Sequence, residues 1–157
     1  MREASMKDIT KFLEYKRVAL VGVSRKRAHF SQVVMREFLA AGYDAVPVNP
    51  QAAEIEGRKC FARVADIVPP TQAALLLTGT PQTTDHAVRE CREADIRNIW
   101  VYKDVHEGVE HEKAMELCRS RGFILIEGYC PLMFLPGAKF FHRAHGFFVK
   151  LVGHYPL

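Results

Sequence analysis

The sequence predicts an α/β fold in which a parallel sheet of five strands carries helices on both faces. Short apolar runs, typical of strands buried on both sides, alternate along the chain with longer segments of helical periodicity. Each run ends in glycine, proline or polar turn residues. The chain has 157 residues, 48% hydrophobic and 25% charged, which suits one folded domain with a sizeable core.

The first elements are a covering helix, a buried strand and a second helix. Ser5 to Tyr15 has apolar side chains at helical spacing, with its first serine and Asp8 in capping-box positions. Arg17 to Ser24 begins as a continuous apolar run and ends in glycine and polar residues, which predicts a buried strand. Ser31 is predicted to cap the following helix, and Gly42 to stop it.

The same alternation continues through the rest of the domain. Further strands are predicted at 44–48, 73–77, 96–102 and 123–126. Thr80 and Pro81 are suited to begin a helix that ends near Asp95, and another helix is predicted at 109–121. Residues 52–70 are less regular, with one short helix at 61–67. Strands that alternate with helices in this way predict a doubly wound, Rossmann-like sheet.

Charge and cysteine spacing exclude several classes of protein. Lys and Arg number 22 against 18 Asp and Glu, and this excess of +4 without interleaved aromatic residues argues against nucleic-acid binding. The four cysteines are widely spaced with no C-x-x-C, which argues against a zinc ribbon or a redox motif. No run approaches the ~18 apolar residues of a membrane span, and the N-terminus lacks a signal-peptide core. We therefore expect a cytoplasmic protein.

The turn after the first strand is the main candidate for a ligand site, because open doubly wound sheets bind ligands at the carboxyl ends of their strands. Gly22 permits a close backbone approach, and the start of the next helix favours an anion. Arg25, Lys26 and Arg27 add positive charge beside it. The sequence therefore predicts a phosphate site, with a solvated basic turn as the alternative interpretation.

This turn departs from the dinucleotide fingerprint G-x-G-x-x-G. Ser24 and Arg27 replace its second and third glycines. The second strand ends in Val48-Asn49-Pro50, which offers no carboxylate for the ribose hydroxyls. A cationic loop without that acid suits a nucleotide with an additional phosphate, either the 2'-phosphate of NADP or the 3'-phosphate of coenzyme A.

Several short motifs occur in a fixed order along the chain. They are V-G-V-S-R-K at 21–26, P-V-N-P at 47–50, G-R-K-C-F at 57–61, Thr-Pro at 80–81, I-W-V-Y at 99–102 and Cys-Pro at 130–131. From about Phe12 to Pro131, this pattern resembles the CoA-binding proteins related to the N-terminal domain of the succinyl-CoA synthetase alpha subunit. The resemblance implies a nucleotide-binding fold with coenzyme A across the carboxyl ends of the strands.

The resemblance also implies contacts from the turns at four strand ends. The diphosphate would be held by Gly22, Val23, Ser24 and Lys26, and the nucleotide would be lined by Asn49 and Pro50. The adenine would be covered by Thr80 and Pro81, and the path of the pantetheine arm would be bordered by Tyr102 and Lys103. From charge alone, we add Arg25 or Arg27 as the partner of a phosphate. Cys130 is predicted to be a buried, inert thiol rather than a reactive one.

We expect residues 1–133 to form the CoA-binding domain and 134–157 a C-terminal extension rich in Phe and His. His142 and His145 would share a helical face, but the segment offers them no acidic or cysteine partner, so no metal site is predicted. An apolar stripe in this segment is expected to pack on the domain or on a second copy, which leaves a homodimer open.

The sequence therefore predicts a small, non-catalytic protein that binds coenzyme A or an acyl-CoA. The synthetase uses a separate domain to supply a phosphorylated histidine, and this chain is too short to include it. We assign no catalytic residue, although whether any reaction is catalysed stays open. The alternatives are an NADP-dependent reductase, an acyl-CoA ligase component, or a scaffold whose cleft no longer binds a nucleotide.

Overall fold

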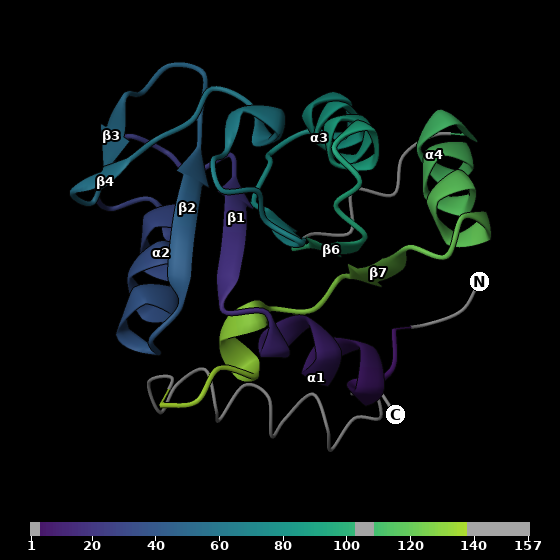
Figure 1. The fold of residues 1–157 in the computed structure, drawn as a ribbon, viewed down its shortest axis with the longest axis horizontal. Helices are drawn as coiled ribbons and strands as arrows, with labels where there is room; N and C mark the ends of the chain where they lie inside the picture. Colours follow the sequence, from purple (N-terminus) through teal and green to yellow (C-terminus); the bar gives the residue numbers. More distant parts are fainter. Residues whose placement is uncertain (1–3, 103–108, 138–157) are drawn as a thin grey trace.

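A five-stranded parallel sheet forms the centre of the molecule (Figure 1). The computed structural model describes residues 4–102 and 109–137. The strand order is β2-β1-β5-β6-β7. The strands are β1 Arg17–Val21, β2 Asp44–Val48, β5 Ala73–Leu76, β6 Asn98–Val101 and β7 Ile124–Glu127. This arrangement confirms the predicted α/β, doubly wound fold.

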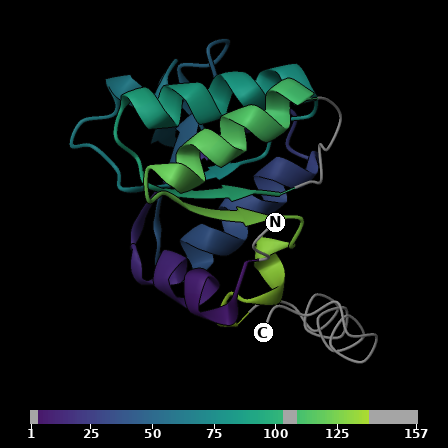
Figure 2. The same ribbon diagram turned by 90° about the vertical axis from the view of Figure 1, so that its right-hand side faces the viewer.

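In the described part of the chain, two helices cover each face of the sheet, and Figure 2 shows the layers from the side. The helices on one face are α1 Met6–Glu14 and α2 Phe30–Ala40. Those on the other face are α3 Pro81–Glu93 and α4 Val109–Ser120. The sheet therefore separates two apolar cores.

The strands read as continuous apolar runs because successive side chains enter different cores. In β1, Val18 and Leu20 lie in the core beneath α1 and α2, and Ala19 and Val21 lie in the core beneath α3 and α4. All four side chains are buried. Burial on both faces is typical of parallel sheets and accounts for the absence of a polar alternation in the sequence.

The helix ends follow the predicted caps except at α2. Ser5 and Asp8 form the predicted capping box of α1, and Thr80 caps α3 with Pro81 in the first turn. The prediction that Ser31 caps α2 is wrong, because α2 begins at Phe30. The N-cap is His29, whose Nδ1 accepts from the Ser31 amide at 3.2 Å.

Between β2 and β5 the chain forms a small antiparallel hairpin that the sequence pattern did not predict. Its strands are β3 Glu54–Ile55 and β4 Arg58–Lys59, joined by Glu56 and Gly57. Strands of two residues are too short to show a period of two. The predicted helix at 61–67 shortens to one 3₁₀ turn, η1, at Val64–Asp66.

The C-terminal extension lies largely outside the described residues. A second 3₁₀ turn, η2 at Pro131–Met133, follows β7, and the description ends at residue 137. His142 and His145 fall beyond it, so the predicted boundary at 133 stays a prediction. None of the helices in the described part of the chain combines the length and hydrophobicity that a membrane span needs.

Candidate functional site

The ends of β1, β2 and β5 lie side by side at the point where the strand order reverses. β1 lies between β2 and β5, and the chain leaves β1 through α2 on one face of the sheet but leaves β5 through α3 on the other face. The Gly22 amide donates to the Val48 carbonyl at 2.9 Å, and the Leu77 amide donates to the Val21 carbonyl at 2.8 Å. Such a reversal is where open α/β sheets bind ligands.

Gly22 is required by its backbone and by its neighbours. Its φ of +88° lies in the left-handed region that L side chains rarely adopt. A Cβ built on it would lie 3.2 Å from the Leu77 carbonyl oxygen and 3.3 Å from the Thr78 amide nitrogen. The missing side chain therefore lets the loop after β1 pass directly over the end of β5.

Polar side chains of the loop after β1 and of α2 hold this loop in one conformation. The Ser24 amide donates to Ser31 Oγ at 2.9 Å, and the Lys26 amide donates to Ser24 Oγ at 3.1 Å. Gln32, which is buried, donates from Nε2 to the Ser24 carbonyl at 2.7 Å. This leaves the side chains of Arg25, Lys26 and Arg27 exposed on an ordered backbone.

Ser31 and His29 resemble a nucleophile and its base, but their surroundings indicate a structural role. Ser31 Oγ lies 2.8 Å from His29 Nδ1. Since Nδ1 also accepts from the Ser31 amide, the ring nitrogen carries no proton and the hydroxyl donates to it. Only 1% of Ser31 is exposed, so its hydroxyl has no access to a ligand.

Asn49 follows β2, the strand beside β1, and Tyr102 follows β6, which is two strands away from β1 on the other side. Asn49 Nδ2 donates to the Val23 carbonyl at 2.8 Å, and its Oδ1 accepts from the Gln51 amide at 2.8 Å. The Tyr102 ring stacks on Phe30 with the centroids 4.8 Å apart. The Asn49 amide group thus positions two turns, and Tyr102 forms an aromatic wall beside the start of α2.

Thr80 and Pro81 lie at the start of α3, after the end of β5. Thr80 Oγ1 accepts from the Thr83 amide at 3.2 Å, which completes the cap. Pro50 is exposed and follows Asn49 at the end of β2. Lys103 lies outside the described residues. Among the predicted site residues, Asn49 contacts Val23 directly. Gly22 contacts Val48, Ser24 contacts Ser31, and Tyr102 stacks on Phe30.

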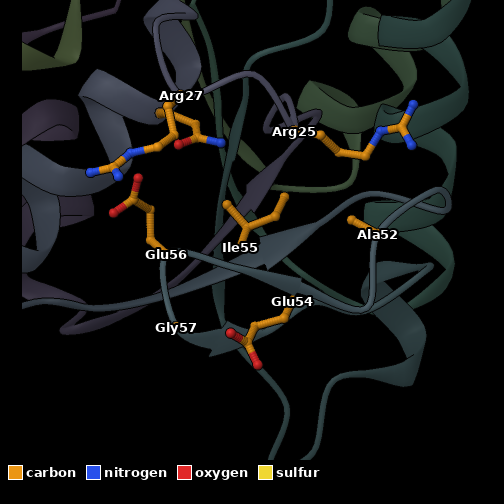
Figure 3. Close-up of a pocket in the computed structure, with 8 residues that line it drawn as sticks. Arg25, Arg27, Ala52, Glu54, Ile55, Glu56 and Gly57 are labelled. Atoms are coloured by element: carbon orange, nitrogen blue, oxygen red, sulfur yellow. The ribbon is translucent and has the colours of Figure 1, made fainter.

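A pocket of about 510 Å³ opens between this loop and the hairpin β3–β4 (Figure 3). Arg27 and Glu56 lie together on one side of it, whereas Arg25 extends to the opposite side. The sequence did not predict that the hairpin forms one wall of this pocket, because Glu56-Gly57 was the only part of the hairpin that resembled a turn signal. The lining residues are Arg25, Arg27, Gln32, Ala52, Glu54, Ile55, Glu56 and Gly57.

The thiols and the phenol near the strand ends are uncharged at neutral pH. Burial raises the pKa of the Cys60 and Cys130 thiols above the ordinary value. Burial, reinforced by Cys130, also raises the pKa of Tyr102. Neutral thiols are poor nucleophiles, which suits Cys130 to packing rather than reaction. In the described residues, no group of three or more His, Cys, Asp or Glu is placed to hold a metal ion.

Comparison with known proteins identifies a family and a relative that this chain resembles. Residues 16–136 match the family described as the CoA binding domain. Uncharacterized protein YneT of Bacillus subtilis (strain 168) is 28% identical over 131 residues, which are 83% of this chain and 93% of that protein.

Solved structures share the fold over most of the chain. A hypothetical protein from Pyrococcus horikoshii OT3 is 28% identical with a TM-score of 0.68, over 83% of this chain and 94% of that one. The dinucleotide-forming acetyl-coenzyme A synthetase 1 of Ca. Korarchaeum cryptofilum, solved with phosphate and ADP, is 21% identical with a TM-score of 0.61. That match covers 72% of this chain but 25% of the synthetase, and it concerns the fold alone.

Proposed function

The chain belongs to the CoA binding domain family, and from this premise we propose that it binds coenzyme A or an acyl-CoA at the carboxyl ends of β1, β2, β5 and β6. The observation that carries the proposal is the loop after β1. Its backbone is ordered by Ser24 and its three cationic side chains are exposed. It also begins at a glycine whose missing side chain lets the loop lie directly against the end of β5.

The charges of the loop match those of coenzyme A. The diphosphate and the 3'-phosphate are anionic, and guanidinium groups bind phosphate through two parallel hydrogen bonds. The start of α2 adds the positive end of the helix dipole. We infer that Lys26 and the loop backbone contact the diphosphate, and that Arg25 or Arg27 pairs with a further phosphate.

The proposed role is binding without chemistry. Support comes from the burial of Ser31, which withdraws its hydroxyl from a ligand, and from the neutral thiols of Cys60 and Cys130. A protein of this kind would sense or carry coenzyme A or its thioesters. Incubation of the protein with acetyl-CoA should therefore return the thioester unchanged.

Calorimetry with three nucleotides tests the proposal. We expect coenzyme A to bind more tightly than dephospho-CoA, which lacks the 3'-phosphate, and more tightly than NADPH. If NADPH binds and coenzyme A does not, the same cations serve a 2'-phosphate and the reductase alternative replaces this proposal. If none of the three binds at millimolar concentration, the proposal is wrong.

Removal of two loop cations tests the site itself. Lys26→Ala with Arg27→Ala should weaken coenzyme A binding by about 1 to 3 kcal/mol, or roughly 5- to 150-fold, because charge-assisted contacts to phosphate are lost. The difference from wild type should shrink at high salt if the contacts are exposed. Calorimetry at two salt concentrations measures both effects.

A matched control removes two cations elsewhere. Lys7 and Lys11 are exposed on α1 and are replaced together by alanine. This control variant carries the same change in net charge and should bind coenzyme A nearly as tightly as wild type. Equal losses in the two double variants would mean that net charge, and not the loop, governs binding.

A further inference from the structure

One guanidinium group ties the cationic loop to the hairpin. Arg36 of α2 donates from Nη1 and Nη2 to the Arg27 carbonyl at 3.3 and 3.2 Å. Its Nη1 also lies 2.9 Å from Glu56 Oε1 in an ion pair. A further contact of 3.4 Å joins Nη1 to Gln32 Oε1, and Gln32 in turn holds the Ser24 carbonyl.

Glu56 occupies a backbone conformation that its residue type disfavours. With φ values of +52° and +70°, Glu56 and Gly57 form the two-residue turn of the hairpin. Both positions of such a turn favour Gly, Asn or Asp, because other side chains are crowded there. Strain of this kind persists where the surroundings impose it. The ion pair with Arg36 is the contact that accounts for a glutamate here.

The position of Glu56 is also unexpected on electrostatic grounds. Its carboxylate lines the pocket on the same side as Arg27 (Figure 3). A negative charge beside an anion site weakens the binding of an anion through space. The Glu56 side chain is 18% exposed, so this charge is only partly screened by water. Its benefit to the site must therefore come from a contact within the protein, and not from the field that its charge exerts on a ligand.

We propose that Arg36 and Glu56 form a brace, the Arg36–Glu56 brace, which positions the Arg27 end of the loop for a phosphorylated ligand. This inference rests on the proposed function. The hairpin carboxylate orients the guanidinium, which then holds the Arg27 carbonyl and the α2 side chain Gln32. The loop cations are thereby presented in a binding geometry before the ligand arrives, which lowers the entropy cost of binding. Glu56 is a positioning residue that touches no ligand.

Glu56→Asn separates positioning from charge and from folding. Asparagine is favoured at this turn position, so the hairpin should keep its stability while the ion pair is lost. If Glu56 acted only by repelling the anionic ligand through space, its removal would tighten coenzyme A binding. The brace has the opposite consequence, and we expect calorimetry to show binding weakened by roughly three- to tenfold. Tighter or unchanged binding would overturn the proposal while leaving the proposed function intact.

Glu54→Gln is the matched control. Glu54 lines the same pocket and is exposed, and it forms no ion pair with another of the described residues. Its replacement removes one negative charge without touching Arg36. Binding of coenzyme A should stay the same or tighten slightly. A loss equal to that of Glu56→Asn would indicate a general effect of hairpin substitution and would contradict the brace.

A second readout needs no ligand. Trypsin cleaves after Arg25, Lys26 and Arg27, all of which are exposed, and local opening of the loop should control the rate. Cleavage at these sites, followed by mass spectrometry, should be several-fold faster in Glu56→Asn than in wild type and Glu54→Gln. Equal cleavage rates would overturn the brace, whether or not wild type binds coenzyme A. Failure of wild type to bind coenzyme A would refute the proposed function separately.

Arg36→Lys completes the design. Lysine keeps the charge but cannot reach the Arg27 carbonyl and the Glu56 carboxylate together from one planar group. It should accelerate trypsin cleavage and weaken coenzyme A binding to the same extent as Glu56→Asn. Because both changes break one brace, the double variant should resemble either single variant. Additive losses would mean that the two residues act independently.

Discussion

At the scale of single residues, polar side chains of the loop after β1 and of the first turn of α2 bind the backbone of that loop. Ser24, Ser31 and Gln32 form a chain of hydrogen bonds that fixes the backbone. The sequence predicted that Ser31 caps α2, because serine is common at helix N-caps. Its hydroxyl instead accepts from the Ser24 amide, which is seven residues away, so the cap passes to His29.

Gly22→Ala should destabilise the protein by about 2 to 3 kcal/mol, because left-handed backbone strain and the 3.2 Å approach to the Leu77 carbonyl add together. Gly42→Ala is the control. Gly42 has a similar φ of +86° but nothing within 4 Å of its Cβ position, so about 1 kcal/mol is expected. Urea unfolding measures both. Equal losses would show that the close approach at Gly22 has no energetic consequence.

At the scale of elements, helix boundaries followed local signals whereas the hairpin depended on distant contacts. The Ser5–Asp8 capping box and the Thr80-Pro81 start of α3 agree with the sequence. The hairpin strands are too short to show an alternation of polar and apolar residues. The ion pair between Arg58 and Asp44 of β2 ties β4 to the sheet. A pair separated by 14 residues cannot be found from local spacing.

The packing of α3 against α4 predicts a loss of stability at alkaline pH. Burial raises the pKa of Cys91 in α3 and of Cys118 in α4 above the ordinary value of 9.0. Above pH 9 the unfolded chain releases these protons while the native protein keeps them. The stabilisation is therefore fully present below pH 9 and is lost as the pH rises, by at most about 1.4 kcal/mol per unit for each thiol.

Urea unfolding at pH 8 and pH 10 measures this loss. The double variant Cys91→Ala and Cys118→Ala is the control, and it should lose less stability between the two pH values than wild type does. Its lower stability at pH 8, caused by the cavities, does not affect this difference. An equal loss in both proteins would mean that other groups, and not these thiols, set the alkaline limit.

At the scale of the whole molecule, one sheet joins the two apolar cores. Trp100 of β6 is fully buried in the core beneath α1, where its ring lies 5.3 Å from that of Phe12. Its Nε1 donates to the Tyr129 carbonyl at 2.9 Å. The residues on either side of it, Ile99 and Val101, enter the opposite core. Loss of one core therefore disrupts the strands that form the other.

Trp100, the single tryptophan of the chain, reports this coupling. Its fluorescence and the far-UV circular dichroism signal should give coincident urea unfolding curves, as in a two-state transition. Trp100→Phe should lower stability by about 1 to 3 kcal/mol, because volume and the hydrogen bond to Tyr129 are lost. Separate midpoints for the two signals in wild type would show that the cores unfold independently.

The order of the residues specifies the alternation of strands and helices, because strands buried on both faces must be continuous apolar runs and caps are local. It also specifies a cationic loop at a strand end. Tertiary contacts decide which of the loop's side chains are exposed to a ligand. Asn49 reaches Val23 across 26 residues and Arg36 reaches Glu56 across 20, and pairs so far apart meet only when the sheet and hairpin assemble.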